Sequence, residues 1–495
     1  MKNILKSLVC FFLIAFSLQS CNDNDDVDTE THDALKDLEI KNFVWKGLNE
    51  VYLWQGDVPN LADNRFASQN DLDSFLNGYS KPEDLFEDLL NKPESKYPNG
   101  DAIDRFSWIV DDYTVLEQEL NGITKNSGID FRLGRQEDGS NDLVGYIRYI
   151  IPNSDASKKD IKRGDLFTKV NGTPLTVSNY EKLLLDSDSY TLNLAVFNGN
   201  AFVSNGKSVS LTKTTLEENP ILVNKVIASG SHKIGYLMYN GFYSEYDNAL
   251  NQAFAQLKSG GATDLVLDLR YNGGGSVRSA TLLASMITGQ FKGQIFSKRQ
   301  FNAKQMTGLN SEELESLNER FTDKTNSGAG LNSLNLNTVY IITTDNTASA
   351  SELVINGLRP YINVIQIGET TVGKNVGSFT VYDSETLTKT NVNPTHKYAM
   401  QPLVFKITNA DNFGDYTGGL PPTFQQSEKI STYGILGDTS EPLLNLVISK
   451  ITGSTAKRIQ IDKDHISPYF TDSKSMRRFG KEMYLESTPK EFLKR

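Results

Sequence analysis

The feature that most constrains the fold is a succession of strand, turn and helix that occurs twice in the second half of the chain. Residues 265–269 form a short, nearly continuous apolar run, as in a strand that is buried on both faces. A glycine turn, residues 272–275, and a segment with apolar residues at helical spacing follow it. Residues 338–343 lead in the same way into a helical stretch. Repeated units of this kind predict an α/β core, which we place at residues 225–453.

Two loops of this predicted core carry side chains that suggest catalysis. Ser349 lies where the strand at residues 338–343 turns into a helix, and Lys374 lies in the loop after the β-rich run 363–367. A serine hydroxyl is a poor nucleophile unless a base takes its proton, and a lysine is such a base only when it is kept neutral. Free backbone amides at a helix N-terminus would stabilise an oxyanion. We therefore predict a Ser–Lys dyad; the alternative is a helix N-cap serine and a surface lysine.

The neighbouring polar residues have structural explanations. Ser351 and Glu352 fit capping and dipole effects in the first helical turn. We also expect Asp268 and Arg270 to be structural. The glycine turn is not a phosphate loop, since no Gly-Lys-Ser or Gly-Lys-Thr follows it.

The rest of the chain divides into regions that differ in the spacing of their apolar and turn residues. Residues 33–121 show mainly helical spacing and predict an N-terminal helical cap, whereas residues 122–213 read as short strands separated by turns. Residues 454–495 form a tail to which the sequence assigns no function.

The start of the chain has the pattern of a secretory leader. Lys2 and Lys6 precede a short apolar run within residues 1–20, which is too short to span a bilayer. Residues 21–32 are polar and acidic, which indicates a solvated tether or, by resemblance, a surface-export signal of some Gram-negative bacteria. The sequence before Cys21 resembles a bacterial lipobox, in which this cysteine carries the lipid; the alternative is an ordinary cleaved leader.

Composition excludes several classes of function. The formal net charge of -11 argues against binding to nucleic acid, which needs clustered Lys and Arg. With only Cys10 and Cys21, the mature chain has no intramolecular disulfide and no thiolate metal site. The four histidines are scattered, so we expect no metal and no cofactor.

Three strings in the predicted core resemble the signatures of the C-terminal processing peptidases, also called tail-specific proteases. They are residues 268–275, residues 347–352 and the pair Gly373-Lys374. The resemblance implies a crotonase/ClpP-like core in which Ser349 is the nucleophile and Lys374 the general base. The oxyanion donors would be the backbone amides of Gly274 and Ala350. The family usually has a glutamine four residues after the lysine to orient its amine, and here Ser378 stands in that place.

The β-rich region, in turn, resembles a PDZ domain. Residues 152–156 and 161–172 follow the order of a PDZ turn, helix, strand and turn. PDZ domains add a peptide strand to a sheet edge and capture its terminal carboxylate. By this resemblance, Gly128, Ile129, Asp130 and Phe131 would bind peptide. The alternative is a PDZ-shaped spacer that binds nothing.

The sequence therefore predicts a secreted, lipid-anchored serine endopeptidase that cleaves peptides or protein C-terminal tails through an acyl-enzyme. It would be attached through Cys21 to the bacterial outer membrane, on the periplasmic side or at the cell surface. A rival interpretation is a non-catalytic lipoprotein that keeps the peptidase fold to bind peptides. A smaller contender is a serine–histidine mechanism that uses His396.

Overall fold

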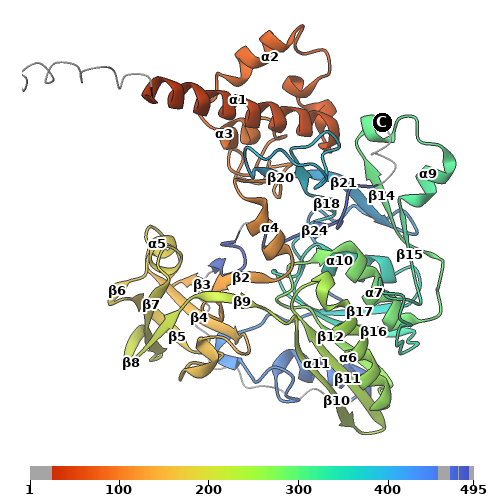
Figure 1. Ribbon diagram of the computed structural model, residues 1–495. Helices are drawn as coiled ribbons and strands as arrows, with labels where there is room; N and C mark the ends of the chain where they lie inside the picture. Colours follow the sequence, from red (N-terminus) through yellow and green to blue (C-terminus); the bar gives the residue numbers. More distant parts are fainter. Residues whose placement is uncertain (1–24, 455–468, 478, 490–495) are drawn as a thin grey trace, which may run out of the picture.

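The computed structural model describes residues 25–454, 469–477 and 479–489. Over these residues the chain forms a helical part (top in Figure 1), a β-rich part (lower left) and an α/β part (lower right). The predicted leader at residues 1–20 and the predicted lipid attachment residue Cys21 lie outside the described residues. Among the helices that are described, none is both long and apolar enough to traverse a bilayer.

The N-terminal part is helical, and its apolar side chains belong to an apolar core that continues into the α/β part. Its elements are α1 (Asp25–Val51), η1 (Gln55–Asp57), η2 (Pro59–Leu61), α2 (Gln69–Leu76) and α3 (Pro82–Asp88). Val44, Leu48 and Leu85 are fully buried in this core. The helix α1 begins at Asp25, inside the stretch 21–32 that was expected to be a tether.

The end of this part contains a strand that the sequence pattern did not indicate. β1 (Trp108–Val110) pairs with β20 (Ala399–Gln401), which also pairs with β19 (Val381–Tyr382). Three residues are too few to show an alternating pattern. β1 is followed by α4 (Tyr113–Leu120), whose N-cap Asp112 accepts a hydrogen bond from the Thr114 amide.

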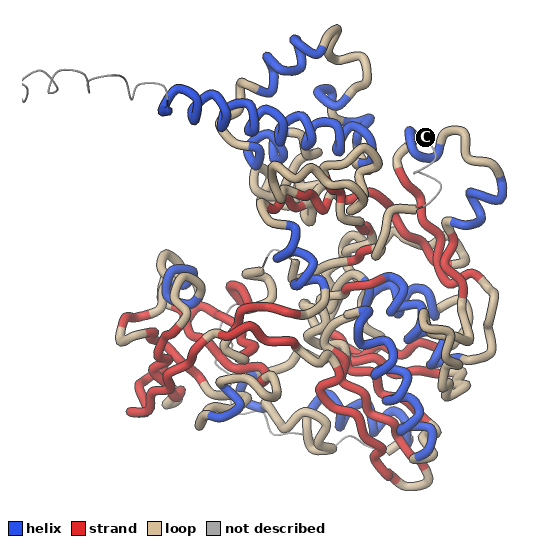
Figure 2. Tube along the Cα trace, in the orientation of Figure 1, coloured by secondary structure: helices blue, strands red, loops and turns tan. Residues whose placement is uncertain are grey.

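The β-rich part contains a sheet with its own apolar core. The sheet has the order β23-β3-β4-β5-β7-β8, with β6 paired to β5, and all its pairs are antiparallel. The elements are β2 (Ile123–Asn126), β3 (Ile129–Arg135), β4 (Leu143–Ile150), η3 (Ala156–Lys158), β5 (Leu166–Val170), β6 (Thr173–Pro174), α5 (Tyr180–Leu184), β7 (Ser189–Phe197), β8 (Phe202–Thr212), β9 (Thr214–Glu217) and β23 (Tyr469–Asp472). The strands gather on the left of Figure 2. The edge strand β23 comes from the C-terminal tail.

The α/β part is built on the sheet β10-β11-β12-β16-β17-β22, which is parallel except for the pair β10 and β11. These strands are β10 (Ile221–Ser229), β11 (His232–Tyr239), β12 (Asp264–Asp268), β16 (Thr338–Thr343), β17 (Asn363–Gly368) and β22 (Phe424–Gln425). Leu265 and Leu267 face one apolar cluster, whereas Val266 faces another. The strand at 265–269 is therefore buried on both faces, as its composition predicted.

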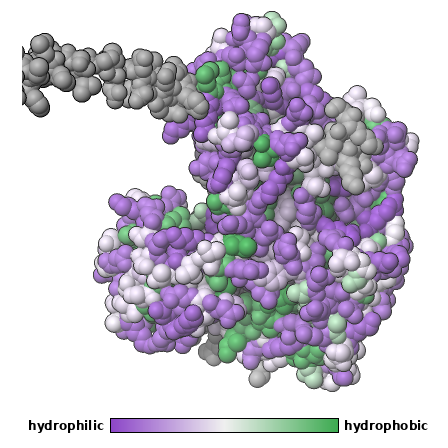
Figure 3. Space-filling model, viewed as in Figure 1, coloured by the Kyte–Doolittle hydropathy of each residue, from purple (hydrophilic) through white to green (hydrophobic). Residues whose placement is uncertain are grey.

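Helices cover both faces of this sheet. α6 (Asp247–Ser259), α7 (Val277–Thr288) and α10 (Ala350–Leu358) pack on the face that holds Leu265, whereas α11 (Pro442–Thr452) packs on the other. The short helices η4 (Ser244–Tyr246) and η5 (Ile430–Thr432) lie in the connecting loops. The surface seen in Figure 3 is largely hydrophilic, which agrees with the burial of apolar side chains between the helices and the sheet.

A second six-stranded sheet completes the α/β part. Its order is β13-β24-β18-β21-β14-β15. The strands are β13 (Gly275–Ser276), β24 (Met483–Tyr484), β18 (Val376–Ser378), β21 (Leu403–Asn409), β14 (Ile295–Phe301) and β15 (Asn318–Arg320), with the short helices α8 (Ala303–Met306) and α9 (Ser311–Ser316) beside them. The strand β24 from the C-terminal tail lies inside this sheet, between the glycine turn and the strand after Lys374.

Candidate active site

Ser349 lies in the sharp turn that joins β16 to α10. Its backbone has φ 64° and ψ −115°, a region that residues other than glycine rarely adopt, and its side chain is fully buried. Hydrogen bonds fix the turn, because the Thr347 hydroxyl donates to the Leu269 carbonyl and the Ala348 amide donates to the Asn272 carbonyl. A strained serine between a strand and a helix is the arrangement that presents a nucleophile in many hydrolases.

The glycine turn approaches this serine closely. A Cβ atom at Gly274 would lie 2.7 Å from the Ser349 Cβ and 2.9 Å from the Ala350 backbone nitrogen. Gly274 has φ +110°, so a side chain here would be strained as well as crowded. Ala350 is the first residue of α10, where a backbone N–H has no partner within the helix. The Gly274 amide donates to the Asn272 side-chain oxygen at 2.8 Å in this structure.

Lys374 is fully buried in the loop between β17 and β18. Its Nζ donates to the Lys481 carbonyl at 2.6 Å, lies 3.2 Å from Glu482 Oε2, and sits over the Phe106 ring. Burial lowers the pKa of the Lys374 amine, and the Glu482 carboxylate opposes part of that shift. A lowered pKa is what a lysine needs to act as a base near neutral pH.

The loops that carry Ser349 and Lys374 meet on one buried carboxylate, Glu352. Its Oε2 accepts from the Ser349 amide at 2.7 Å and from the Lys374 amide at 2.9 Å. Its Oε1 accepts from the Gly373 amide at 2.7 Å and from the Thr371 hydroxyl. The sequence explained Glu352 by capping and dipole effects in the first helical turn, and the capping bond to the Ser349 amide is present. The bonds to the lysine loop had no signal in the sequence, because they depend on how two distant loops fold together.

The hydroxyl and the amine are not hydrogen-bonded to each other. Ser349 Oγ is buried without a hydrogen-bond partner, and the Lys374 amine is held by the C-terminal tail instead. Ser378, predicted to orient the lysine, donates through Oγ to the Met483 carbonyl at 3.3 Å and accepts from Gln401 at 2.9 Å. Within the described residues, the carboxylate beside the amine is that of Glu482, to which the sequence assigned no role.

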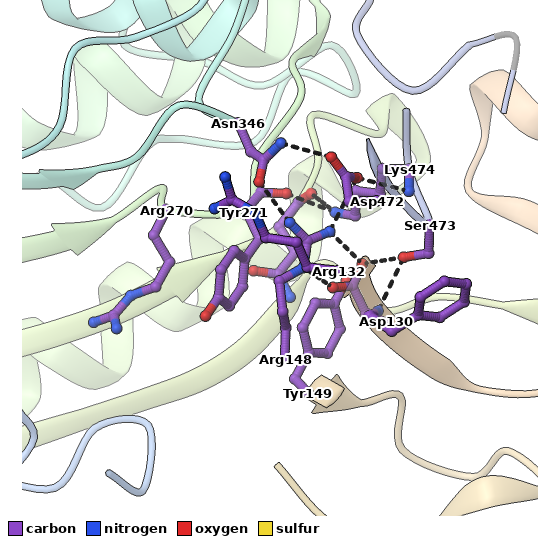
Figure 4. A network of polar contacts seen from close by, with 12 residues as sticks. Asp130, Arg132, Arg148, Tyr149, Arg270, Tyr271, Asn346, Asp472, Ser473 and Lys474 are labelled. Carbon is purple, nitrogen blue, oxygen red and sulfur yellow. Dashed lines mark hydrogen bonds and ion pairs between the residues drawn. The ribbon is translucent and has the colours of Figure 1, made fainter. Parts of the chain in front are cut away.

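The four residues predicted to bind peptide lie at the start of β3, and the chain itself occupies their edge. The Phe131 amide donates to Ser473 Oγ at 3.1 Å, and the Ser473 amide donates to the Phe131 carbonyl at 2.9 Å. Ile129 faces the apolar core of the β-rich part, and the Gly128 amide bonds to the side chain of Asn126. Asp130 is buried against Arg148, as Figure 4 shows.

The other polar residues considered in the sequence bond to side chains outside the Ser349 and Lys374 loops. Arg270 is fully buried and bonds to Asp268, Glu428 and Glu441, so this pair is structural, as expected. The His396 ring bonds to Asp383 and packs against Phe43 of α1. In the part of the chain that the structure describes, no cluster of three or more His, Cys, Asp or Glu side chains is suited to a metal ion.

Two family models match the sequence. Residues 233–393 match peptidase family S41, and residues 39–108 match the peptidase S41 N-terminal domain. These ranges contain Ser349, Lys374 and the glycine turn in the first case and most of the N-terminal helical part in the second.

Curated relatives are similar over part of their length. A candidate CtpA-like serine protease of Staphylococcus aureus (strain COL) is 23% identical over 317 residues, which are 63% of this chain and 58% of that protein. A chloroplastic C-terminal processing peptidase of Tetradesmus obliquus is 29% identical over 147 residues, which are 28% of this chain and 32% of that protein. The chain spans about half the length of the staphylococcal relatives that it matches.

A solved structure has a similar fold. The crystal structure of a candidate S41 protease from Bacteroides fragilis NCTC 9343 is 27% identical and superposes with a TM-score of 0.62. The similarity covers 83% of this chain and 97% of that one.

Proposed function

Because this chain belongs to peptidase family S41, we propose that it is a serine endopeptidase that uses Ser349 as nucleophile and Lys374 as general base. The observation that carries the proposal is the pairing of a strained, buried serine with a buried lysine whose loops share the Glu352 carboxylate.

In the proposed reaction, the neutral Lys374 amine takes the Ser349 proton as Oγ attacks the scissile carbonyl carbon. The oxyanion that forms is stabilised by the amides of Gly274 and Ala350, once the Gly274 amide turns away from Asn272. The C–N bond then breaks, and the lysine returns the proton to the leaving amine. Water hydrolyses the acyl-enzyme on Ser349 through the same lysine.

The substrate that we propose is a peptide or an unfolded protein tail with a free C-terminus. In support, one of the similar proteins is a chloroplastic C-terminal processing peptidase, and β3 of the β-rich part pairs along one side with a strand from the C-terminal tail, β23, as a peptide strand would pair there. We propose that this part acts as a PDZ-like peptide-binding unit through residues 128–131. We also propose attachment to the outer membrane through a lipid on Cys21, on the basis of the lipobox-like sequence before it.

The experiment is to treat the full chain with a serine-directed acylating probe and to locate the label by mass spectrometry. We expect the label on Ser349 and its loss in Ser349→Ala and in Lys374→Ala. A folded protein that binds peptides without acylation would instead be the non-catalytic lipoprotein.

Two further variants complete this experiment. An unchanged rate in His396→Ala would exclude a serine–histidine mechanism. The lipid is tested separately, by growing cells with a labelled fatty acid and comparing the wild type with Cys21→Ser, in which labelling should be lost.

A further inference from the structure

The C-terminal segment, by which we mean residues 469–477 and 479–489, lies in two places where a peptide strand would bind. Its strand β23 pairs with the edge of β3, and its strand β24 lies between β13 and β18. We infer that this segment occupies the substrate cleft of its own chain as a substrate mimic, and that a substrate peptide has to displace it. The inference rests on the proposed function, since the cleft is defined by the proposed catalytic residues.

The strand β24 makes the backbone contacts of an extended substrate. The Gly275 amide donates to the Glu482 carbonyl at 2.5 Å, and the Leu485 amide donates to the Ser378 carbonyl at 2.9 Å. Gly275 follows the proposed oxyanion glycine, and Ser378 lies four residues after the proposed base. The segment therefore runs between the two halves of the catalytic site, and a peptide cannot take this path while the segment is there.

The segment also holds the side chain that the reaction needs. Lys374 Nζ donates to the Lys481 carbonyl and is paired with Glu482, so in this state the amine is directed to the segment. Ser349 Oγ has no hydrogen-bond partner in the same state. When the segment leaves, the amine loses both of these partners and is free to bond to the serine.

Polar contacts anchor the segment to both the β-rich and the α/β part, as Figure 4 shows. The fully buried Arg148 bonds to Asp472 of the segment, to Asp130 of β3 and to Asn346, three residues before Ser349. Lys474 of the segment donates to two backbone carbonyls, those of Asn240 and Tyr271. The anchors lie outside the proposed catalytic residues, so they can be weakened without changing the chemistry.

The docked C-terminal segment makes both favourable and unfavourable contributions to its free energy of docking, as expected of a segment that a substrate peptide can displace. Met483 and Leu485 are buried in the main apolar cluster, which favours docking. Against this, Ser349 Oγ is buried without a hydrogen-bond partner. Buried polar atoms that stay unpaired destabilise the state that contains them. A pocket lined by Gly274, Glu482 and Tyr484 also remains beside the glycine turn.

A thiol at the docked strand measures undocking without relying on catalysis. Leu485→Cys in a full chain with Cys10→Ser and Cys21→Ser carries a single thiol, at a position that is 8% exposed in the docked state. A free peptide of sequence Lys-Glu-Met-Tyr-Leu-Glu, the sequence of residues 481–486, should accelerate modification of this thiol about tenfold at saturation. A scrambled peptide should not. An unchanged rate would show that β24 is a permanent strand and would overturn the inference.

Variants of the anchors connect undocking to reactivity. Asp472→Asn and Lys474→Met should each raise both the thiol modification rate and the acylation rate at Ser349 about tenfold, the factor expected for loss of one hydrogen bond to a charged group. Asp188→Asn, which removes an exposed ion pair with Lys125, is the matched control and should change neither rate.

Two outcomes separate this inference from the proposed function. If the thiol becomes accessible but acylation stays constant or falls in a protein of unchanged melting temperature, the segment does not block the site and the inference is wrong. If no form of the protein is acylated at Ser349, the proposed function fails, and displacement of the segment by the free peptide still decides whether it occupies a peptide site.

Discussion

The replacement of Glu352 by glutamine tests whether one carboxylate positions both catalytic loops. Four donors converge on this side chain, the amides of Ser349, Gly373 and Lys374 and the hydroxyl of Thr371. A glutamine has the same shape, but its NH₂ group faces two of these donors and cannot accept from them. Glu352→Gln therefore breaks either the bonds to the Ser349 and Lys374 amides, one from each loop, or the bonds to the Gly373 amide and the Thr371 hydroxyl, both from the lysine loop.

The expected cost follows from these contacts. A hydrogen bond to a charged group contributes about 1.5–3 kcal/mol, so the loss of two amounts to about 3–6 kcal/mol. Burial raises the pKa of Glu352, which means that keeping this carboxylate charged is itself costly, and the neutral glutamine recovers part of that cost. We expect a net loss of about 2–4 kcal/mol of unfolding free energy. A displacement of the nucleophile by about 1 Å should lower the acylation rate about 100-fold.

The assay measures both quantities on the same protein, urea unfolding for stability and acylation of Ser349 for reactivity. Glu441→Gln is the matched control, because Glu441 is equally buried, bonds to Arg270 and caps α11. It should lose stability and keep the acylation rate of the wild type. Equal acylation rates in Glu352→Gln and Glu441→Gln would refute a positioning role for Glu352.

Three further predictions concern individual groups. Because burial lowers the pKa of Lys374 below its usual 10.5, acylation of Ser349 should rise with pH through that lowered pKa, and Lys374→Met should remove the rise in a pH–rate profile. Ser349→Gly should abolish acylation. Measured by urea unfolding, the same variant should have an unfolding free energy about 1 kcal/mol higher, because glycine adopts the φ of 64° without strain. A variant less stable than the wild type would contradict this. Burial alone would raise the pKa of Glu428, but the charges of Arg163 and Arg270 outweigh burial and lower this pKa from 4.5 to about 2. The charged Glu428 therefore stabilises the folded protein fully above pH ~4.5, and this stabilisation is lost as the pH falls toward 2. Glu428→Gln should therefore cost about 3 kcal/mol at pH 7, and an equal unfolding free energy in both proteins would refute this.

Much of the α/β part could be predicted because its signals are local. The apolar run at residues 265–269 is a buried strand, and the glycine turn after it approaches the strand-to-helix turn at Ser349. The strand and the glycine turn depend on residues that are adjacent in sequence, so composition and spacing are enough to indicate them, whereas the approach of Gly274 to Ser349 was indicated by the family resemblance. The proposed roles of Ser349, Lys374, Gly274 and Ala350 stay predictions.

The contacts that could not be predicted join segments far apart in the chain. The two-residue strand β24 has no period to detect, and its position depends on pairing with β13 and β18. For the same reason no role could be predicted for Glu482, which lies beside the Lys374 amine although the two residues are 108 positions apart in the chain. No function could be assigned from the sequence to the tail at residues 454–495, yet its described residues supply one strand to each of two sheets.

The position of β24 also bears on the order of folding. Its contact with Ser378 spans 105 residues, and the contact between Glu486 and Ser276 spans 210. β24 lies between β13 and β18 in the sheet, so the facing edges of β13 and β18 stay unpaired until β24 docks. Contacts of such large sequence separation form late and slowly. A refolding chain should therefore regain its parallel sheet first and close the gap between the glycine turn and the lysine loop in a separate, slower phase.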